Sequence, residues 1–363
     1  MGVKSRIREQ PELIDRIYIE ERCRDHPRTR RICDRFPRAE RVYCDSYREV
    51  FNPAAQNFRL QKRRPALILA VKPDGFVTPT PSGYGIGGDR NYYFSHMLNC
   101  IYDCRYCFLQ GMYRSAHYVV FVNFEDFEGA IRKQTRRDHG HEPWFFSGYD
   151  CDSLALEPVT GFMGRMLALF EGLPAARLEL RTKSTQIRSL ADRPAMANVV
   201  VAFSLTPEEV SRRLEHRVPA LGRRIAALGE LAARGWRVGL RFDPLICEPG
   251  FEAHYDELFA AVFTAIDPAV VHSVTLGAFR MPKEFHARVE RLYPDEPLYA
   301  MPMSERQGVL CYPRDVESRM LRYCRDRLRD YVPAWKIYGH EVHSRQDGVC
   351  AQAAAREVVS AGA

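Results

Sequence analysis

Cys-Ile-Tyr-Asp-Cys-Arg-Tyr-Cys, residues 100–107, is the stretch that most narrows the fold and the chemistry of this chain. Its three cysteines, Cys100, Cys104 and Cys107, have a Cys-x3-Cys-x2-Cys spacing in which all three thiolates can reach one inorganic cluster. A structural zinc site needs four closed ligands, and an electron-carrying [4Fe–4S] cluster also takes four cysteines. Three ligands therefore predict an iron–sulfur cluster that leaves one iron open to another molecule.

Two other interpretations of these cysteines stay open. The chain holds 11 cysteines in 363 residues, so zinc with a distant fourth ligand would fit, as would buried or disulfide-bonded thiols. The first residues show no apolar run of signal-peptide length, and no stretch of about 18 apolar residues predicts a membrane span. We therefore expect a cytoplasmic protein without membrane contact, whose cysteines stay reduced and bind metals or react.

The charge pattern is moderately basic. The chain has 53 Lys and Arg against 46 Asp and Glu, a net charge of +7. The basic residues gather in three runs, at 24–43, 60–65 and 131–141. Such runs favour a polyanionic partner such as nucleic acid. A solvated, arginine-rich surface is the alternative, because acidic residues are interspersed.

The order of predicted elements indicates an α/β fold. Apolar runs of strand length alternate with helical patterns from about residue 90 onward, which predicts a parallel sheet. The expected strands are 65–72 near the N-terminus, then 117–123, 144–148, 177–183, 199–205, 236–246 and 271–279. The expected helices are 124–137, 158–173, 207–216, 219–234, 252–266 and 315–330.

The cysteine loop and its aromatic neighbours resemble the radical S-adenosylmethionine (SAM) superfamily. Over most of its length the chain resembles the spore photoproduct lyase family, through CIYDCRYCFLQ, LRTKST at 180–185 and VAFSLTPEEV at 201–210. The resemblance implies a partial (β/α)6 barrel. We expect this barrel at 89–295, after an N-terminal α/β wing at 1–88 and before a small C-terminal cap at 296–345 and a flexible tail at 346–363.

The resemblance also implies the cofactors and the reaction. The expected reaction splits the spore photoproduct, 5-thyminyl-5,6-dihydrothymine, in ultraviolet-damaged DNA through a 5′-deoxyadenosyl radical, with a reductant such as flavodoxin or ferredoxin as electron donor. A [4Fe–4S] cluster would be held by the three cysteines of the loop. SAM would be bound by Tyr106, Phe108, Lys183 and Ser204, with Lys183 pairing with its carboxylate.

A hydrogen donor must stand near the substrate, and a thiol suits this task. Cys151 is a candidate, although alignment on Asp152 places the family's donor position at Tyr149. Because residues two apart in an extended strand share a face, Cys151 is expected near the same cavity. Cys151 donates, Tyr149 donates, or the donor is absent. Spore-forming members of the family carry a relay tyrosine at the position of Phe108. Phenylalanine has no O–H, so a two-tyrosine relay cannot run here.

Contacts to DNA are expected outside the cofactor site, because the lesion must be extruded from the base stack into the pocket. The candidates are Arg280, Lys283 and Arg314 for phosphates and Tyr312 for stacking. The departures at Phe108 and Cys151 favour one alternative, a radical SAM enzyme of this scaffold acting on another nucleic-acid or peptide substrate. A separate alternative is a non-catalytic Fe–S protein that binds nucleic acid.

Overall fold

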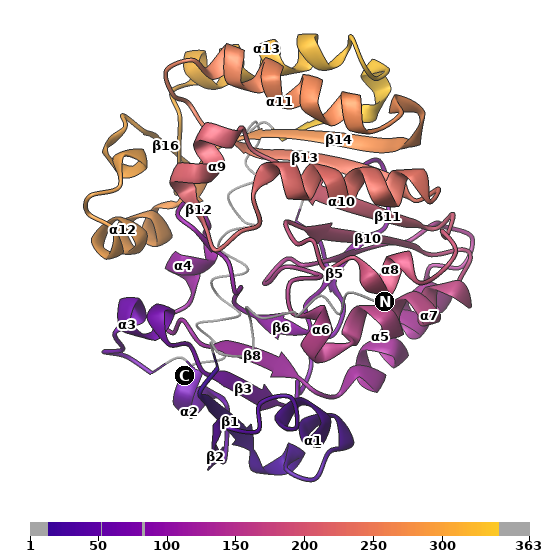
Figure 1. Ribbon diagram of the computed structural model, residues 1–363, viewed down its shortest axis with the longest axis vertical. Coiled ribbons are helices and arrows are strands. Elements are labelled where there is room, and N and C mark those ends of the chain that lie inside the picture. Colours follow the sequence, from indigo (N-terminus) through magenta and orange to yellow (C-terminus); the bar gives the residue numbers. More distant parts are fainter. Residues whose placement is uncertain (1–13, 52, 82–83, 341–363) are drawn as a thin grey trace, which may run out of the picture.

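A five-stranded N-terminal sheet forms one end of the molecule (Figure 1). The computed structural model describes residues 14–51, 53–81 and 84–340. Neighbouring strands of this sheet run parallel except for the last, which is antiparallel to its partner. In spatial order the strands are β2 (Glu40–Cys44), β1 (Arg16–Glu20), β3 (Leu67–Ala70), β8 (Tyr118–Phe121) and β6 (Met97–Leu98).

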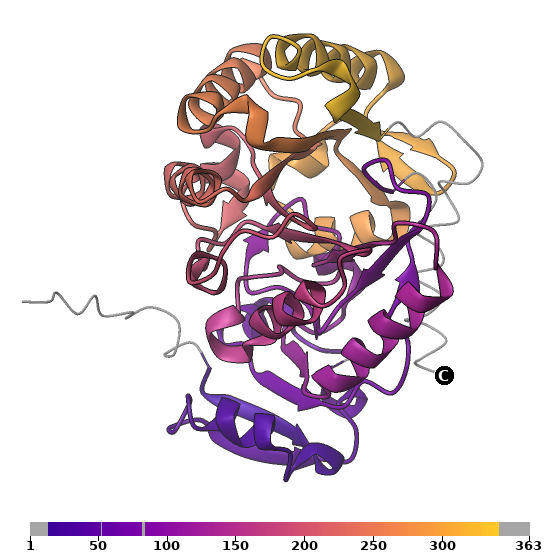
Figure 2. The same ribbon diagram turned by 90° about the vertical axis from the view of Figure 1, so that its right-hand side faces the viewer.

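An eight-stranded sheet forms the larger part of the molecule and curls into a half-barrel (Figure 2). All its neighbouring strands are parallel except at the β4 edge. The predicted α/β partial barrel is thereby confirmed. In spatial order the strands are β18 (Ile337–His340), β14 (Val271–Ala278), β13 (Arg237–Leu245), β11 (Val199–Ser204), β10 (Arg177–Thr182), β9 (Trp144–Ser147), β5 (Asn91–Phe94) and β4 (Thr78–Pro79).

Two small antiparallel sheets lie beside the open side of the half-barrel. One joins β7 (Asp103–Cys104) to β12 (Glu215–His216), and the other contains β15 (Arg280–Pro282), β17 (Val309–Cys311) and β16 (Ser304–Arg306). The α-helices of the described residues are α1 (Pro27–Cys33), α2 (Arg48–Phe51), α3 (Phe58–Arg63), α4 (Leu109–Met112), α5 (Phe124–Arg137), α6 (Glu157–Thr160), α7 (Phe162–Glu171), α8 (Arg188–Ala191), α9 (Glu208–Leu214), α10 (Leu221–Ala233), α11 (Phe251–Ala265), α12 (Lys283–Leu292) and α13 (Arg314–Leu328).

The expectation that residues 117–123 begin the barrel is wrong. This segment forms β8, which pairs with β3 and β6 and therefore belongs to the N-terminal sheet. β5 pairs with β9 in its place and begins the parallel run of the large sheet. β18, from the segment expected to be a cap, extends that sheet beside β14. The predicted domain boundaries stay a prediction, and the expected tail at 346–363 lies outside the described residues.

The expected helix at 158–173 is broken into α6 and α7 at Gly161. This glycine has a φ of 62°, a left-handed conformation that suits glycine because it has no Cβ. The Glu157 carboxylate then accepts hydrogen bonds from the backbone N–H groups of Met163 and Gly164, both at 2.8 Å. A side chain from the preceding helix thus satisfies N–H groups that the start of α7 leaves without intrahelical partners.

One apolar core continues through both sheets, since Ile68 and Val119 of the N-terminal sheet belong to the same buried cluster as Phe145 and Leu180 of the large sheet. Strands such as β3 are apolar along their whole length. This is typical of parallel strands that are covered on both faces. In the described part of the chain, no helix combines the length and the apolar character that a membrane crossing requires.

A charged pair is buried within the large sheet. Arg241 of β13 donates from Nη2 to Oε2 of Glu179 on β10 at 2.7 Å, and Arg181 adds a bond to the same carboxylate at 3.0 Å. Burial alone would raise the pKa of Glu179, but the two guanidinium groups outweigh it and lower the pKa to about 2. The carboxylate is therefore charged at neutral pH and links β10 to β13 across β11.

We expect Glu179→Gln to lower the free energy of unfolding by about 3–5 kcal/mol, because Arg241 would stay buried without its charge partner. Chemical denaturation at pH 7 measures this. Glu209→Gln, which breaks an exposed pair with Arg212, is the control and should have a far smaller effect. Equal losses would contradict the prediction.

The same pair gives a pH dependence. The folded-state pKa of Glu179, about 2, lies below the ordinary value of 4.5. The charged carboxylate therefore contributes fully to the free energy of unfolding above pH 4.5. This contribution is lost as the pH falls from about 4.5 to about 2. The difference in free energy of unfolding between wild type and Glu179→Gln should therefore decrease as the pH falls through this range.

Candidate functional site

The three cysteines of the predicted cluster loop lie between β6 and α4. Cys104 is buried on β7, while Cys100 and Cys107 are half-buried. None of the three is in a disulfide. Asn99, at a φ of 72°, turns the chain into the loop, and its side-chain amide donates to the carbonyls of Ser115 and His117 at 2.9 and 3.1 Å.

This donor set fits an iron–sulfur cluster. Burial raises the pKa of Cys100 to about 12 and also raises the pKa values of Cys104 and Cys107, so free thiolates would be costly there. Metal coordination removes that cost because iron binds the thiolate form. In residues 14–51, 53–81 and 84–340, no three or more Cys, His, Asp or Glu are arranged for a single metal ion. This finding concerns a single ion and not a cluster of several irons, whose cysteine ligands need not meet at one metal ion.

The cysteine loop is attached to the barrel through Glu215, a residue that the sequence analysis missed. In the β7–β12 ladder Glu215 lies opposite Cys104. The Tyr106 hydroxyl donates a hydrogen bond to Glu215 Oε1. Oε2 accepts from Arg224 Nη2 at 2.7 Å and from Ser211 Oγ at 2.9 Å. The expected helix at 207–216 ends early for this reason, since α9 stops at Leu214 and the next two residues pair with the loop.

Lys183 stands where the sequence predicts, directly after β10. Its Nζ is 3.8 Å from Glu215 Oε1 and 5.6 Å from the ring centroid of Tyr106. Its positive charge also reaches Cys104 and Cys107, whose pKa values it lowers against the larger effect of burial. The structure thus brings Lys183 together with the cysteine loop and Tyr106.

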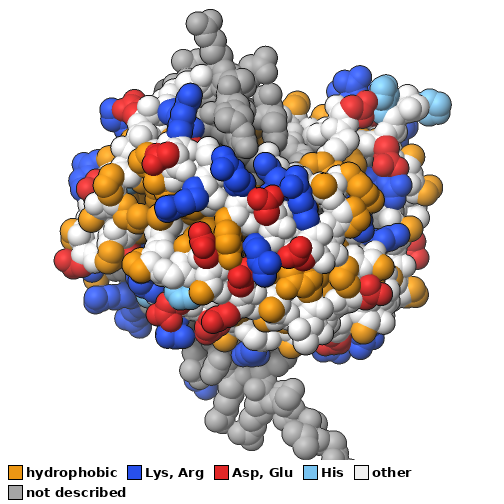
Figure 3. Space-filling view, turned by 90° about the horizontal axis from the view of Figure 1, so that it is seen from above, with side chains coloured by type: hydrophobic (Ala, Val, Ile, Leu, Met, Phe, Trp, Pro, Cys, Tyr) orange, Lys and Arg blue, Asp and Glu red, His pale blue; other side chains and the backbone are white. Residues whose placement is uncertain are grey.

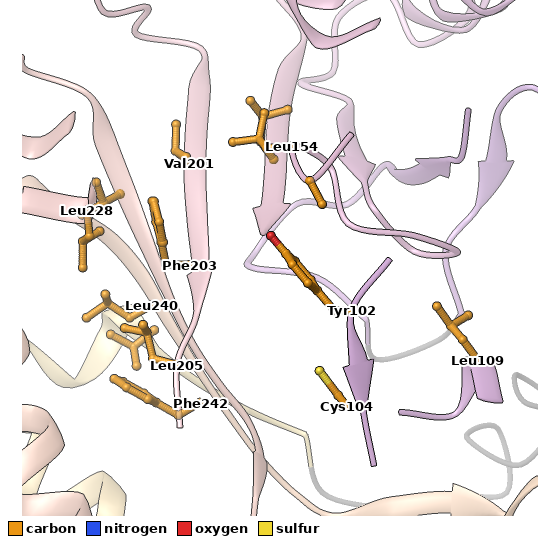
Figure 4. Packing of buried hydrophobic residues seen from close by; sticks show 14 of the residues in the cluster. Tyr102, Cys104, Leu109, Leu154, Val201, Phe203, Leu205, Leu228, Leu240 and Phe242 are labelled. Atoms are coloured by element: carbon orange, nitrogen blue, oxygen red, sulfur yellow. The ribbon is translucent and has the colours of Figure 1, made fainter. Parts of the chain in front are cut away.

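One further candidate, Ser204, lies at the end of a neighbouring strand. Ser204 is the buried last residue of β11, and its carbonyl accepts from Arg224 Nη1 at 3.1 Å. Figure 4 shows the Cys104 side chain pointing from β7 toward β11, which carries Phe203. Arg224 therefore connects Ser204 to Glu215, and through Glu215 to the cysteine loop.

The donor candidates, Tyr149 and Cys151, occupy different surroundings. The Tyr149 ring is half-buried, with its centroid 5.9 Å from that of Phe108 and 4.6 Å from that of Tyr93. Cys151 is 7% exposed and packs in the core cluster that contains Met97 and strands of the N-terminal sheet. Tyr149 thus lies beside the aromatic residue that follows the last cysteine. Cys151 packs in a cluster that Ile101 of the loop also contacts, and negative charge on Cys100 adds to the effect of burial in raising the pKa of Cys151.

Asp152 holds the segment after β9 against the end of β10. Its carboxylate accepts from Thr182 Oγ1 at 2.7 Å, from Lys183 N at 2.6 Å, and from the N–H groups of Leu154 and Ala155 at 2.9 Å. Burial raises the pKa of Asp152, and these hydrogen bonds oppose the rise. The donor segment and Lys183 are consequently fixed to one carboxylate.

The expectation that Tyr312 stacks on a base is wrong. Its ring is 1% exposed, and its hydroxyl accepts from Cys247 N at 3.1 Å, so it belongs to the core. Arg280 forms an ion pair with Asp243 at 3.2 Å, and Lys283 forms one with Glu305 at 2.7 Å. Arg314 is exposed at the start of α13.

Surface charge in the view from above is mixed rather than uniformly basic. Figure 3 shows Lys and Arg side chains interspersed with Asp and Glu on this face. The arginine-rich, solvated surface that the sequence left as an alternative therefore describes this face.

A family model described as "Spore photoproduct lyase" matches residues 13–311. This match covers most of the chain and includes the cysteine loop, Lys183 and Glu215. The chain belongs to the spore photoproduct lyase family. Members of the family are radical SAM lyases that use a [4Fe–4S] cluster and SAM.

Individual spore photoproduct lyases support this assignment. That of Bacillus subtilis is 23% identical over 336 residues, covering 88% of this chain and 96% of the relative. That of Clostridium acetobutylicum is 23% identical over 250 residues, covering 67% and 72%.

Solved spore photoproduct lyases share the fold. A structure complexed with dinucleoside spore photoproduct has a TM-score of 0.77 at 18% identity, covering 91% of this chain and 99% of that one. A mutant with bound AdoMet and the dinucleoside has a TM-score of 0.76 at 18% identity, with coverages of 90% and 98%.

We expect Glu215→Gln to reduce the iron bound per chain after anaerobic reconstitution, because the neutral side chain no longer balances Arg224 or binds Tyr106 as strongly. It should also lower the free energy of unfolding by about 3–5 kcal/mol. Iron analysis and chemical denaturation measure the two effects. Glu179→Gln is the matched control, since it breaks a buried pair away from the loop and should keep its iron. Full iron content in Glu215→Gln would refute the anchoring role.

Proposed function

We propose that this protein splits the spore photoproduct in DNA back into two thymines. The observation that carries the proposal is the Cys100–Cys107 loop beside Lys183, in a chain whose family match spans residues 13–311. Relatives named spore photoproduct lyase, and a solved neighbour holding dinucleoside spore photoproduct, support this substrate. A flavodoxin or ferredoxin is the proposed reductant, because such carriers deliver single electrons to clusters.

Different residues of the site hold the two cofactors. When bound, the cluster and SAM supply a carbon-centred radical that removes a hydrogen atom from the lesion. Cys100, Cys104 and Cys107 bind the cluster. Lys183 would pair with the SAM carboxylate in place of its present 3.8 Å contact with Glu215. Glu215 keeps Tyr106 in place beneath the same ammonium group.

We infer that Tyr149 returns the hydrogen atom to the substrate radical. Its O–H bond breaks as a C–H bond forms on the thymine, and the tyrosyl radical left behind takes one electron from the proposed reductant and a proton from water. A phenolic O–H, like a thiol S–H, is weak enough to be given up to a carbon radical, and Phe108 has no such group. The Tyr149 ring lies 5.9 Å from the ring of Phe108, whereas the Cys151 thiol packs in the core with Met97. Support for Tyr149 is therefore positional.

The DNA contacts proposed here exclude Tyr312. Arg314 is exposed and suits a phosphate contact directly. Arg280 and Lys283 each face a carboxylate, so a phosphate would have to compete with Asp243 or Glu305. Lys283 could exchange Glu305 for a phosphate at little cost in free energy, because exposed ion pairs are weak.

Cluster-reconstituted protein, incubated anaerobically with SAM, a reductant and a thyminyl-dihydrothymine dinucleotide, should release thymidine units. Chromatography follows these units and free 5′-deoxyadenosine together. Cys104→Ala should form neither product, because the cluster loses a ligand. Release of deoxyadenosine without repair would retain radical SAM chemistry and reject this substrate. That outcome would favour the second candidate function, the same chemistry on another nucleic-acid or peptide substrate, which Phe108 and the buried Cys151 make worth testing.

The donor assignment is tested by comparing Tyr149→Phe with Cys151→Ala. We expect Tyr149→Phe to slow thymine recovery at least about tenfold, equivalent to about 1.4 kcal/mol of barrier, while deoxyadenosine still forms. Cys151→Ala should stay near wild type. Chromatography of both products, with deuterium uptake from D2O followed by mass spectrometry, separates the steps. The reverse ranking of the two variants would assign the role to Cys151.

A further inference from the structure

Lys62 is a buried lysine directed at the cysteine loop. It lies on α3 within the basic run at 60–65, yet its side chain is 5% exposed. Its Nζ donates to the carbonyl of Cys100 at 3.2 Å and to that of Tyr102 at 3.1 Å. The ammonium group therefore holds the backbone next to the first cysteine.

Helix α3 buries a lysine and exposes a leucine, the opposite of what these side chains ordinarily prefer. Phe58 and Lys62, four positions apart, share the buried face, while Leu60 is 58% exposed. Leaving a leucine in water while burying a lysine is unfavourable on both counts. The free-energy cost of this arrangement implies a compensating interaction between the buried ammonium group and its surroundings.

The surroundings of Lys62 lack a close counter-ion. In the described part of the chain, no carboxylate lies within ion-pair distance of Nζ, and its bonds to protein go to the two neutral carbonyls. Burial lowers the pKa of Lys62, and negative charge on Asp103, Cys100 and Cys107 opposes this. Two of these three groups, Cys100 and Cys107, belong to the loop whose backbone the Lys62 side chain binds.

We propose that Lys62 is a positioning residue that fixes the Cys100–Tyr102 turn and, through its positive charge, makes the bound cluster easier to reduce. Reduction adds one negative charge to the cluster, and a cation in a low-dielectric site favours the more negative state. Net charge and hydrogen bonding are among the factors that set cluster potentials. This inference rests on the proposed cluster but on no particular substrate.

The test is a redox titration of the reconstituted protein, followed by electron paramagnetic resonance and run without DNA or lesion. Lys62→Met, which keeps the aliphatic length and loses the charge, should have a more negative midpoint potential than wild type. Lys62→Gln, which is neutral but retains a donor, should shift in the same direction. Lys62→Arg should stay closer to wild type. Arg63→Met is the matched control, because it removes one charge from the exposed face of the same helix and should leave the potential unchanged.

Iron content and thermal unfolding are measured on every variant, so loss of the cluster is distinguished from a shift in its potential. Unshifted potentials in both neutral variants, at full iron content, would overturn the inference alone. An equal shift in Arg63→Met would also overturn it, by assigning the effect to surface charge. Wild-type protein that takes up no iron would overturn the inference and the proposed function together.

Discussion

The Glu215 carboxylate is the point on which the candidate site depends. It joins two segments more than 100 residues apart in sequence, since it bonds Tyr106 of the cysteine loop and Arg224 of α10. A buried carboxylate is tolerated only when its charge is balanced and its oxygens are hydrogen-bonded. Here Arg224, Ser211, Tyr106 and the more distant Lys183 meet both conditions. The loop is therefore held by charge as well as by the short β7–β12 ladder.

Buried charge recurs around the half-barrel with different partners. Glu179 and Arg241 neutralise each other within the sheet, and they stabilise it without reaching the loop. Lys62 is bound to neutral carbonyls instead and lacks such a partner among the described residues. The charges of Glu179 and Arg241 are balanced in the protein alone. The charge of Lys62 becomes balanced when the cysteines of the loop are present as anionic thiolates. This contrast separates structural charge from charge that serves a cofactor.

Much of the site could be predicted because its signals are local. The cysteine spacing and the strand-end Lys183 are both readable from short stretches. Strand–helix alternation predicted the parallel sheet, and the family resemblance implied its curvature into a partial barrel. Pairing of β8 with β3 could not be predicted, because an apolar run does not specify its neighbouring strand. Glu215 lay within an apparent helix, Lys62 lay within a basic run, and Tyr312 resembled a surface aromatic. Their roles depend on contacts between distant segments.

The path of the chain between the two sheets has a consequence for how the protein can be divided. β3 lies in the N-terminal sheet, β4 and β5 in the large sheet, β6 and β8 in the N-terminal sheet again, and β9 in the large sheet. The cysteine loop lies between β6 and β8, two strands of the N-terminal sheet, and follows the crossing from β5 to β6. A cut at any point between β4 and β8 would divide both sheets, so no cut there leaves the cofactor loop on a fragment with an intact sheet.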